Sequence, residues 1–454
     1  MKALINWLKV FSLTFLLIIS SCSVNSKSTT TQKTEQQYIE ISRAEYRDKL
    51  AGFWLGQSLA NWTGLVTEMD KVGGDGIHGQ FYTREDWGKA DQPSIWGQGI
   101  PSQLSETIDW VYETPNGIWG SDDDTDIEFM YQYLLVKHQT TRLSPKQIHD
   151  GWLTHIYSDT NTPFKTSDGK PENFLWVSNQ TAHDLMAAGK LPPETSEPKH
   201  NPHIEMIDAQ LTTEIFGLYA PGRPDVALEL SYLPIRTTAR ENAAYAAEFY
   251  VVMHAFAAIQ KATGAEEILW LAEQARQVLP DDSYSAHMFD FVKAEYLKQT
   301  PWESVRDQLY QKYQVEEQGG YNITSKNLYC NGCFASGINF GASLISLFYG
   351  EGDYKQTIKL AVLMGWDSDN PAATWGGMLG FMMGIEALEQ QFEQPFSHRF
   401  NIHRTRGNFP QNGIYSFDEL ALMGIEVIDR VVVNELNGEL IAETNSWVIP
   451  LIEN

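Results

Sequence analysis

The stretch "GSDDDTDIEF" (residues 120–129) places five carboxylates within seven residues: Asp122, Asp123, Asp124, Asp126 and Glu128. Apolar residues recur after it at helical spacing, so the cluster lies at the start of a predicted helix. The positive end of a helix dipole stabilises acidic side chains there by about 0.3–1 kcal/mol each. Capping a helix does not require three consecutive aspartates, however, so the cluster needs a further explanation.

A second acidic stretch, "GWDSDNPAATWGGMLGFMMG" (residues 365–384), also precedes a predicted helix. Asp367 and Asp369 lie two residues apart in it. Asn370 is a favourable N-cap, and Pro371 suits the first helical position. The residues that follow include several small ones, which let another helix approach closely: Ala372, Ala373, Gly376, Gly377 and Gly380.

The two clusters would repel each other strongly if they faced each other without a cation between them. Hard divalent ions such as Mg²⁺ or Mn²⁺ take oxygen ligands of this kind. An EF-hand is the competing metal site, because three aspartates of the first stretch have its alternate spacing. Ile127 stands where an EF-hand needs glycine and Tyr133 where it needs glutamate, which excludes that motif.

The chain has 454 residues, of which 43% are hydrophobic, so it can bury a sizeable core. Its formal net charge is −25, from 33 basic and 58 acidic residues. Nucleic-acid binding is therefore not expected, because a polyanion requires a basic surface. The ordinary interpretation of this charge is an acidic, soluble surface.

The first residues have the pattern of a secretory signal: Lys2 and Lys9, a short apolar run over residues 10–19, then Ser-Ser-Cys. Cys22 in this position resembles the lipidated cysteine of a bacterial lipoprotein; an ordinary signal peptide or an uncleaved anchor is the alternative. We expect a signal peptide over 1–21, a flexible tether over 22–39 and a single domain over 40–454. The protein is then exported and anchored to a bacterial membrane, on its periplasmic or outer-membrane side, through Cys22 only.

Helical patterns dominate from residue 41 onward. Ser42 and Glu45 form a capping-box pattern, and Gly52, Gly56 and Ala60 lie four apart in the helix that follows. Further helices are predicted at about 124–138, 205–219, 223–232, 240–262, 264–279, 284–299, 335–349, 353–364, 371–390 and 416–435. A short strand is predicted near "SWVIPLI", and two long irregular stretches at about 66–120 and 158–204. The sequence therefore predicts an all-α domain with long loops.

Cys330 and Cys333 form an isolated Cys-x-x-Cys pair. Without a second pair, this spacing is weak evidence for zinc. Buried thiols or a disulfide, which an exported protein permits, are therefore expected in preference to a metal site.

The two acidic stretches together resemble the ADP-ribosylglycohydrolase family. Its Thr/Asp-Asp-Asp-Thr signature is matched by residues 122–125, and its Gly-Asp-Thr-Asp-Thr signature by residues 366–370. A glycine-rich first helix ending in Gly-Asp-x-x-Gly-x-x-x-Glu is matched by Asn61, Gly64 and Glu68. A Pro-Gly-x-Pro turn in "APGRPDVALEL" and the stretch "LFYGEGDY" complete the set, and together these motifs span nearly the whole mature chain.

The resemblance implies a compact orthogonal helical bundle with long active-site loops and a site for one or two Mg²⁺ ions, with Mn²⁺ as an alternative. It implies metal ligands at Asp122, Asp123, Asp124, Asp367, Asp369 and Asn370. It further implies catalytic roles for Glu68, Asp123 and Asp369, with Glu68 as the acid near the bond that is cleaved.

The chain departs from the family pattern at several positions. The family often has threonine at Asn370 and aspartate at Asn61; an amide oxygen still ligates a hard cation, so a weaker second metal site is expected rather than none. "LPIRTTARENAAY" lacks the aspartate and histidine that often follow the Pro-Gly turn. The family's substrate preference therefore cannot be transferred directly.

The family hydrolyses the anomeric bond of ADP-ribose attached to proteins or related acceptors. By resemblance, this chain is a Mg²⁺-dependent glycohydrolase of ADP-ribosyl or related ribofuranoside and glycoside substrates. An exported member more plausibly acts on ribosides, nucleotides or glycans. The alternative is a non-catalytic lipoprotein that keeps the metal and binds a ribosyl or glycan ligand.

Aromatic side chains in the long loops could stack on a base or sugar or simply fill the core: Trp87, Trp96, Trp110 and Trp119.

Replacing the predicted lipidated cysteine tests the localisation. Cys22→Ser should abolish incorporation of a radioactive fatty acid in cells and leave the protein soluble or unprocessed, because the acyl acceptor is gone. Equal labelling of the variant and the wild type would show that the lipoprotein signal has been misread.

Overall fold

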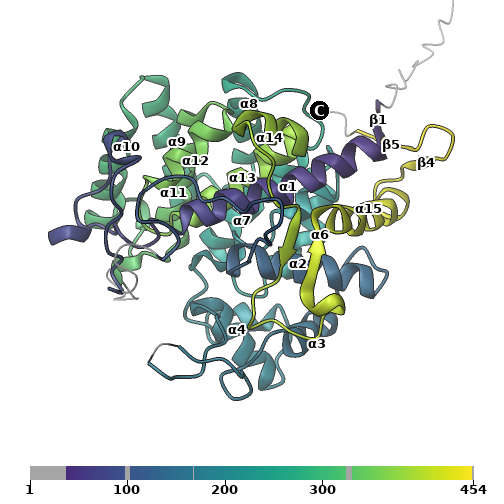
Figure 1. Cartoon of the computed structure of the whole chain (residues 1–454), viewed down its shortest axis with the longest axis horizontal. Helices are drawn as coiled ribbons and strands as arrows, with labels where there is room; N and C mark the ends of the chain where they lie inside the picture. Colours follow the sequence, from purple (N-terminus) through teal and green to yellow (C-terminus); the bar gives the residue numbers. More distant parts are fainter. Residues whose placement is uncertain (1–36, 98–102, 167, 324–329, 452–454) are drawn as a thin grey trace, which may run out of the picture. The chain divides into compact units, whose positions relative to one another are not determined.

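Helix α1 (Arg43–Gly64) begins at Ser42, whose hydroxyl accepts a hydrogen bond from the Glu45 backbone N–H at 3.3 Å. In the computed structural model, α1 runs through the middle of the other helices (Figure 1). It is buried along most of its length. The structure describes residues 37–97, 103–166, 168–323 and 330–451.

Within those described residues, the chain forms fifteen α-helices. After α1 they are α2 (Asp123–Lys137), α3 (Pro145–His155), α4 (Val177–Ala187), α5 (Ile215–Leu218), α6 (Pro224–Ile235), α7 (Glu241–Ala257), α8 (Ala265–Arg276), α9 (Tyr284–Leu297), α10 (Trp302–Leu309), α11 (Ser336–Gly350), α12 (Tyr354–Val362), α13 (Asp369–Met383), α14 (Ile385–Phe392) and α15 (Phe417–Asn434). Short 3₁₀ turns include η4 (Ile207–Ala209) and η7 (Cys330–Gly332), and a π-helical segment, η5 (Tyr310–Val315), continues α10. The fold is all-α, as expected.

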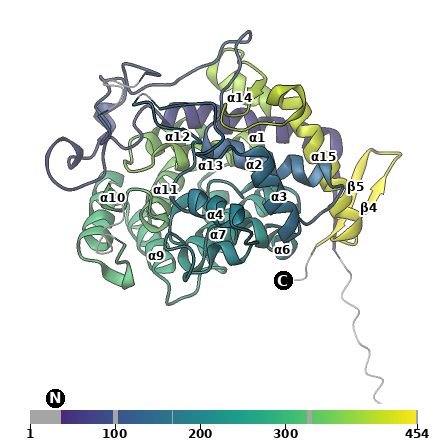
Figure 2. The same ribbon diagram turned by 90° about the horizontal axis from the view of Figure 1, so that it is seen from below.

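The strands are few and short. They are β1 (Tyr38–Ser42), β2 (Arg399–Asn401), β3 (Ile414–Ser416), β4 (Glu439–Ile441) and β5 (Ser446–Pro450). β1, β5 and β4 form one antiparallel sheet in that order, in which Tyr38 pairs with Pro450. Figures 1 and 2 place this sheet beside α15. The strand predicted in "SWVIPLI" is thus confirmed as β5, and its partner β1 begins two residues before the expected domain start at residue 40.

Helices α1 and α13 cross at very short range through their glycines. A Cβ atom added to Gly56 would lie 2.3 Å from the Gly376 carbonyl oxygen, and one on Gly52 would lie 2.4 Å from the Gly380 carbonyl oxygen. No side chain larger than hydrogen fits at these positions. The prediction that the small residues of both helices permit close approach is confirmed. The small residues of α1 pack directly against those of α13.

Several predicted helices differ from the structure. The helix expected at 205–219 is mostly turns, with only η4 and α5 in it. The helix expected at 371–390 is broken at Gly384, whose φ of 79° no right-handed helix accommodates. α13 also begins earlier than expected, at Asp369, with Ser368 as its N-cap in place of Asn370.

Three helices were not predicted: α3, α4 and α10. α4 lies inside a stretch that was expected to be irregular. α3 does carry a local signal, because Ser144 and Gln147 form a reciprocal capping box ahead of it.

The proposed signal peptide, Cys22 and most of the tether lie outside the described residues. Of the helices that the structure describes, none is long and apolar enough to span a membrane.

Replacing one crossing glycine should destabilise the whole domain. Gly56→Ala forces a methyl group against the α13 backbone, so the free energy of unfolding should fall by about 1–3 kcal/mol or more. Urea unfolding followed by circular dichroism measures this. Gly264→Ala is the matched control, because its new methyl group would meet only the end of the Glu267 side chain, at 2.9 Å. Equal stability of the two variants would contradict the close crossing.

Candidate metal centre

The first acidic cluster forms the N-terminus of α2. Asp122 is the N-cap, and its Oδ1 accepts a hydrogen bond from the Asp124 backbone N–H at 3.1 Å. The preceding loop is fixed to α1, because the Trp62 indole N–H donates to the Gly120 carbonyl oxygen at 3.1 Å. The N-terminus of α2 is thereby held against the C-terminal end of α1.

The second cluster begins α13, and the glycine crossing places it against the same end of α1. A Cβ atom on Gly64 would lie 2.3 Å from the Asp369 Cα. The Asn61 amide donates to the Asp369 carboxylate at 3.4 Å. The hydroxyl of Thr67 contacts that of Ser368 at 3.0 Å, so the segment carrying Glu68 is fixed to the same turn.

The structure therefore brings together carboxylates from three separate parts of the chain. Among the described residues, two groups could each hold a metal ion: Glu68 with Asp367 and Asp369, and Asp122 with Asp124 and Asp369. Within each group, one oxygen from every residue lies within 4.8 Å of the others. Asp369 belongs to both groups, so two ions bound there would share it.

Unpaired oxygens at this place fit a cation. Among the described residues, Oδ2 of Asp122, Oδ1 of Asp369 and Oδ1 of Asn61 are buried without a hydrogen-bond partner. A buried oxygen without a partner is costly. Mg²⁺ and Mn²⁺ prefer ligands of this type, so the residues present suit the ion that the family resemblance implies.

The electrostatics of the site lead to the same conclusion. Burial, followed by repulsion from Asp369, raises the pKa of Glu68 and of Asp122 well above the ordinary value. Burial and repulsion from Asp123 raise the pKa of Asp369 to about 7. The buried Arg406 does not relieve this repulsion, because its guanidinium pairs with Asp126 at 2.9 Å. Bound cations or bound protons are required for the carboxylates to lie this close.

Asp123 and Asn370 are two further expected ligands. Asp123 lines the cavity but belongs to neither carboxylate group. Asn370 is buried behind the site: its amide donates to Asp124 Oδ1 at 3.1 Å, and its oxygen accepts from the Gln210 amide at 3.2 Å. Both ends of its amide thus bond protein atoms, and its role as a metal ligand stays a prediction. The hydrogen bond from its amide also orients Asp124.

The carboxylates line a cavity of about 380 Å³. Its remaining lining residues are mostly apolar: Leu65, Trp96, Phe174, Trp176, Val177, Ile207, Asp208, Leu211 and Phe334. Of the four tryptophans considered for stacking, Trp96 alone is in this set. Trp119 is fully buried, and Trp87 packs against Trp110 with the ring centroids 5.5 Å apart. The other three therefore fill the core.

Sequence reasoning missed Asp208, Phe174, Trp176 and Phe334. Asp208 lies on η4, where a regular helix was expected, and it accepts a hydrogen bond from the Asn179 backbone N–H at 2.9 Å. The three aromatic residues lie in irregular segments or at their ends. None of the four carries a local spacing that marks it as part of a site.

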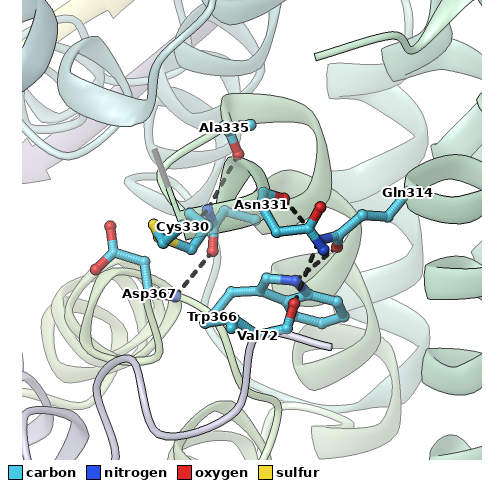
Figure 3. The surroundings of a disulfide bond; sticks show 9 residues. Val72, Gln314, Cys330, Asn331, Ala335, Trp366 and Asp367 are labelled. Carbon is cyan, nitrogen blue, oxygen red and sulfur yellow. Dashed lines mark hydrogen bonds between the residues drawn. A yellow bond between two sulfur atoms is a disulfide. The ribbon is translucent and has the colours of Figure 1, made fainter. Parts of the chain in front are cut away.

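A disulfide between Cys330 and Cys333 closes a turn next to the second acidic cluster (Figure 3). The expectation of a disulfide or thiols in preference to zinc is confirmed. Asn339 donates to the Cys333 carbonyl oxygen at 2.7 Å and accepts from the Asp367 backbone N–H at 3.2 Å. Gln314 donates to the Asn331 carbonyl oxygen at 2.7 Å and accepts from the Trp366 indole at 2.8 Å. Two amide side chains thus connect the disulfide turn to residues 366 and 367.

The structure thus combines an all-helical fold with acidic residues from three chain segments around one cavity, where a metal ion could be held. A sequence model of the ADP-ribosylglycohydrolase family matches residues 42–411, and the chain belongs to that family. Among solved structures, it is similar to an "ADP-ribosylglycohydrolase-related protein complex", with 16% identity and a TM-score of 0.46 over 85% of this chain and 98% of that one. No curated protein matches it in sequence.

Divalent metal should stabilise the folded protein, and the effect should depend on the shared carboxylate. At 100 times its Kd, Mg²⁺ or Mn²⁺ should add about 2.7 kcal/mol to the free energy of unfolding. Asp369→Asn should abolish this stabilisation by metal, because it removes a charge from both groups.

Asn339→Ala should weaken metal affinity about 10- to 100-fold, the usual effect of losing a residue that orients a ligand.

Calorimetric titration and thermal unfolding of EDTA-treated protein measure both effects. Asp281→Asn is the control, because its side chain is 95% exposed on the surface. An unchanged melting temperature for the wild type on adding metal, or an Asp369→Asn variant that binds metal normally, would contradict a metal centre at this place.

Proposed function

We propose that the protein is a Mg²⁺-dependent glycohydrolase that cleaves the anomeric bond of ADP-ribosyl or related ribofuranoside and glycoside substrates. Family membership supports a glycohydrolase. The observation that carries the proposal is the pair of overlapping carboxylate groups, which share Asp369 and line a cavity large enough for a small molecule.

Asp122, Asp124, Asp367 and Asp369 would hold one or two divalent ions, with Asn61 and Glu68 beside them. When bound, such an ion supplies charge that orients sugar hydroxyls and lowers the pKa of a water molecule. Asn370 and Asn339 keep Asp124 and Asp367 oriented through the hydrogen bonds described above. Because these ligands are already oriented in the folded protein, they need not rearrange during the reaction.

Glu68 is the residue best placed to move a proton. Its side chain is only partly buried, unlike Asp369 next to it, and it lines the cavity. Burial and the neighbouring acids raise its pKa, which suits a group that gives a proton to a leaving group and then takes one from water. Glycoside hydrolysis requires such a carboxyl group close to the anomeric carbon.

Asp123 has a different task in this proposal. It is also only partly buried, it lines the cavity, and it is a member of neither carboxylate group. A carboxylate so placed stabilises the positive charge that develops on the sugar ring as the anomeric bond breaks. Asp369 would link the two carboxylate groups, because it is a member of both.

The place of action is proposed from the sequence alone. The N-terminal pattern supports export and lipid anchoring at Cys22. The substrate is then a molecule met outside the cytoplasm, and the fatty-acid labelling of Cys22→Ser is the test.

Removing the ionisable group of Glu68 should slow turnover without removing metal. Glu68→Gln keeps the size and one oxygen of the side chain, so kcat should fall about 10²–10⁴-fold, the usual general acid–base contribution. Metal affinity should change far less than in Asp369→Asn, which loses metal and rate together. The assay is release of free sugar from ribosides, furanoside glycans and ADP-ribosylated peptides, with and without Mg²⁺.

Glu85→Gln is the matched control, because Glu85 is exposed in the same long loop region. Wild-type turnover by Glu68→Gln would assign the glutamate a structural role. If the wild type cleaves no member of the panel but binds one of them with metal, the protein is instead a non-catalytic lipoprotein that binds a ribosyl or glycan ligand.

A further inference from the structure

We propose that the disulfide between Cys330 and Cys333 holds one of the two carboxylate groups in place, and that its reduction weakens metal binding there. The affected group is the Glu68 group: Glu68, Asp367 and Asp369. The other, the Asp122 group, should keep its affinity: Asp122, Asp124 and Asp369. This inference rests on the metal centre of the proposed function and adds a means of regulating it.

The disulfide closes a turn whose backbone conformation is uncommon. Asn331 has a φ of 58° and Gly332 has a φ of 77°, so two consecutive residues lie in the left-handed region. Asparagine enters that region at a cost in free energy, whereas glycine does so freely. A covalent link between Cys330 and Cys333 removes many of the other conformations that this segment could adopt. Without the link, the turn should therefore move more freely.

One connection runs from this turn to Asp367. The Asn339 amide donates a hydrogen bond to the Cys333 carbonyl oxygen at 2.7 Å, and its oxygen accepts one from the Asp367 backbone N–H at 3.2 Å. Asn339 is fully buried on α11, so its amide is held between the turn and the start of the second acidic cluster. A shift of the Cys333 carbonyl group therefore acts on the backbone of a proposed metal ligand.

A second connection runs from the turn toward Glu68. The Gln314 amide donates to the Asn331 carbonyl oxygen at 2.7 Å, and its oxygen accepts from the Trp366 indole N–H at 2.8 Å (Figure 3). The Trp366 carbonyl oxygen in turn accepts a hydrogen bond from the Met69 backbone N–H at 2.9 Å. Met69 directly follows Glu68, so both connections end beside members of the Glu68 group.

The Asp122 group is held by different contacts. Asp122 Oδ1 accepts from the Asp124 backbone N–H at 3.1 Å, and the Asn370 amide donates to Asp124 Oδ1 at 3.1 Å. The loop before α2 is fixed to α1 through the Trp62 indole. These contacts include no residue of the disulfide turn and neither of the two connecting amides. Loss of the disulfide should therefore affect one group more than the other.

The more accessible cysteine is Cys330, which is only partly buried, whereas Cys333 is fully buried. An external thiolate would attack the Cys330 sulfur, and the S–S bond would break as the Cys333 sulfur leaves as a thiolate and takes up a proton. A second thiolate attacks the external sulfur of the mixed disulfide and releases Cys330, which is also protonated. Two external thiols are oxidised to one disulfide, and the two cysteines are reduced.

The redox state of the surroundings would thus set the affinity of one metal site. Thiols persist in a reducing compartment, and disulfides form in an oxidising one. Under the export predicted from the N-terminal pattern, the Glu68 group would reach its full affinity only after the chain has left the cytoplasm.

Calorimetric titration of the full-length chain with Mg²⁺ or Mn²⁺, oxidised and reduced, tests the proposal. Reduction with dithiothreitol, which is then removed without admitting oxygen, should free two thiols, counted after unfolding. One ion should then bind about 10- to 100-fold more weakly, the usual effect of losing a group that orients a metal ligand. Reoxidation with glutathione disulfide should restore the original affinity.

Variants that disable one group show which ion responds. In Asp122→Asn, the remaining ion is held by the Glu68 group, so reduction should weaken its binding by the same factor as in the wild type. In Asp367→Asn, the remaining ion is held by the Asp122 group, and reduction should leave its affinity unchanged.

A variant without the cross-link controls for the reductant. Cys330→Ser combined with Cys333→Ser should bind metal like the reduced wild type, and dithiothreitol should not change it further. Circular dichroism and thermal unfolding without metal should show a folded protein, because a disulfide that closes so short a loop constrains the unfolded chain least. If this variant does not fold, the reduced and reoxidised wild type decides the question.

An Asn339→Ala variant separates positioning from general loosening of the fold. Reduction should have a smaller effect in it than in the wild type, because one of the two connections is already broken and the two changes are not additive. In Asp281→Asn, whose side chain is 95% exposed on the surface, reduction should act as in the wild type.

The outcomes separate this inference from the proposed function. Equal metal affinities of the oxidised and reduced wild type would overturn the inference and leave the metal centre standing. Equal weakening in Asp122→Asn and Asp367→Asn would also overturn it, because the disulfide would then support the fold as a whole. If the oxidised wild type binds no metal, the metal centre fails and the inference fails with it.

Discussion

The close crossing of α1 and α13 is the constraint on which the site depends. Glycines on both helices let the backbones touch, and the same crossing brings Gly64 against Asp369. The end of α1 and the start of α13 therefore share one small volume, into which α2 also directs its N-terminus. A larger residue at the crossing would separate the helices and with them the carboxylates.

Burying so many acids is costly for a folded protein, because charged groups lose their hydration. The structure offsets part of the cost with two helix N-termini, the Asp126–Arg406 pair and amide side chains such as Asn370. The rest is not offset by any described residue, as the unpaired oxygens of Asp122 and Asp369 show. This excess of buried negative charge is what cations bound in the folded state would neutralise.

Much of this arrangement could be predicted from the sequence, because its parts are local. Two local patterns can be read from single stretches of the sequence: consecutive aspartates before a helical pattern, and small residues four apart. These patterns predicted helices α2 and α13 and the close approach of another helix to α1. Asp208 and Trp176 could not be found in this way, because loops bring them to the site and their neighbours carry no periodic pattern. Asn370 was expected to cap α13, but Ser368 is the N-cap. The hydrogen bonds of the Asn370 amide to Asp124 and Gln210, which are distant in sequence, could not be predicted either.

The order of these parts along the chain has a consequence for biosynthesis. The Asn61–Asp369 contact joins residues 308 positions apart. Long-range contacts of this kind form late, because the intervening chain must first be ordered. A nascent chain carries its first acidic cluster long before α13 emerges to complete the site. The earlier segments must therefore stay soluble before the site is complete, and a cation held by both clusters would be loaded last.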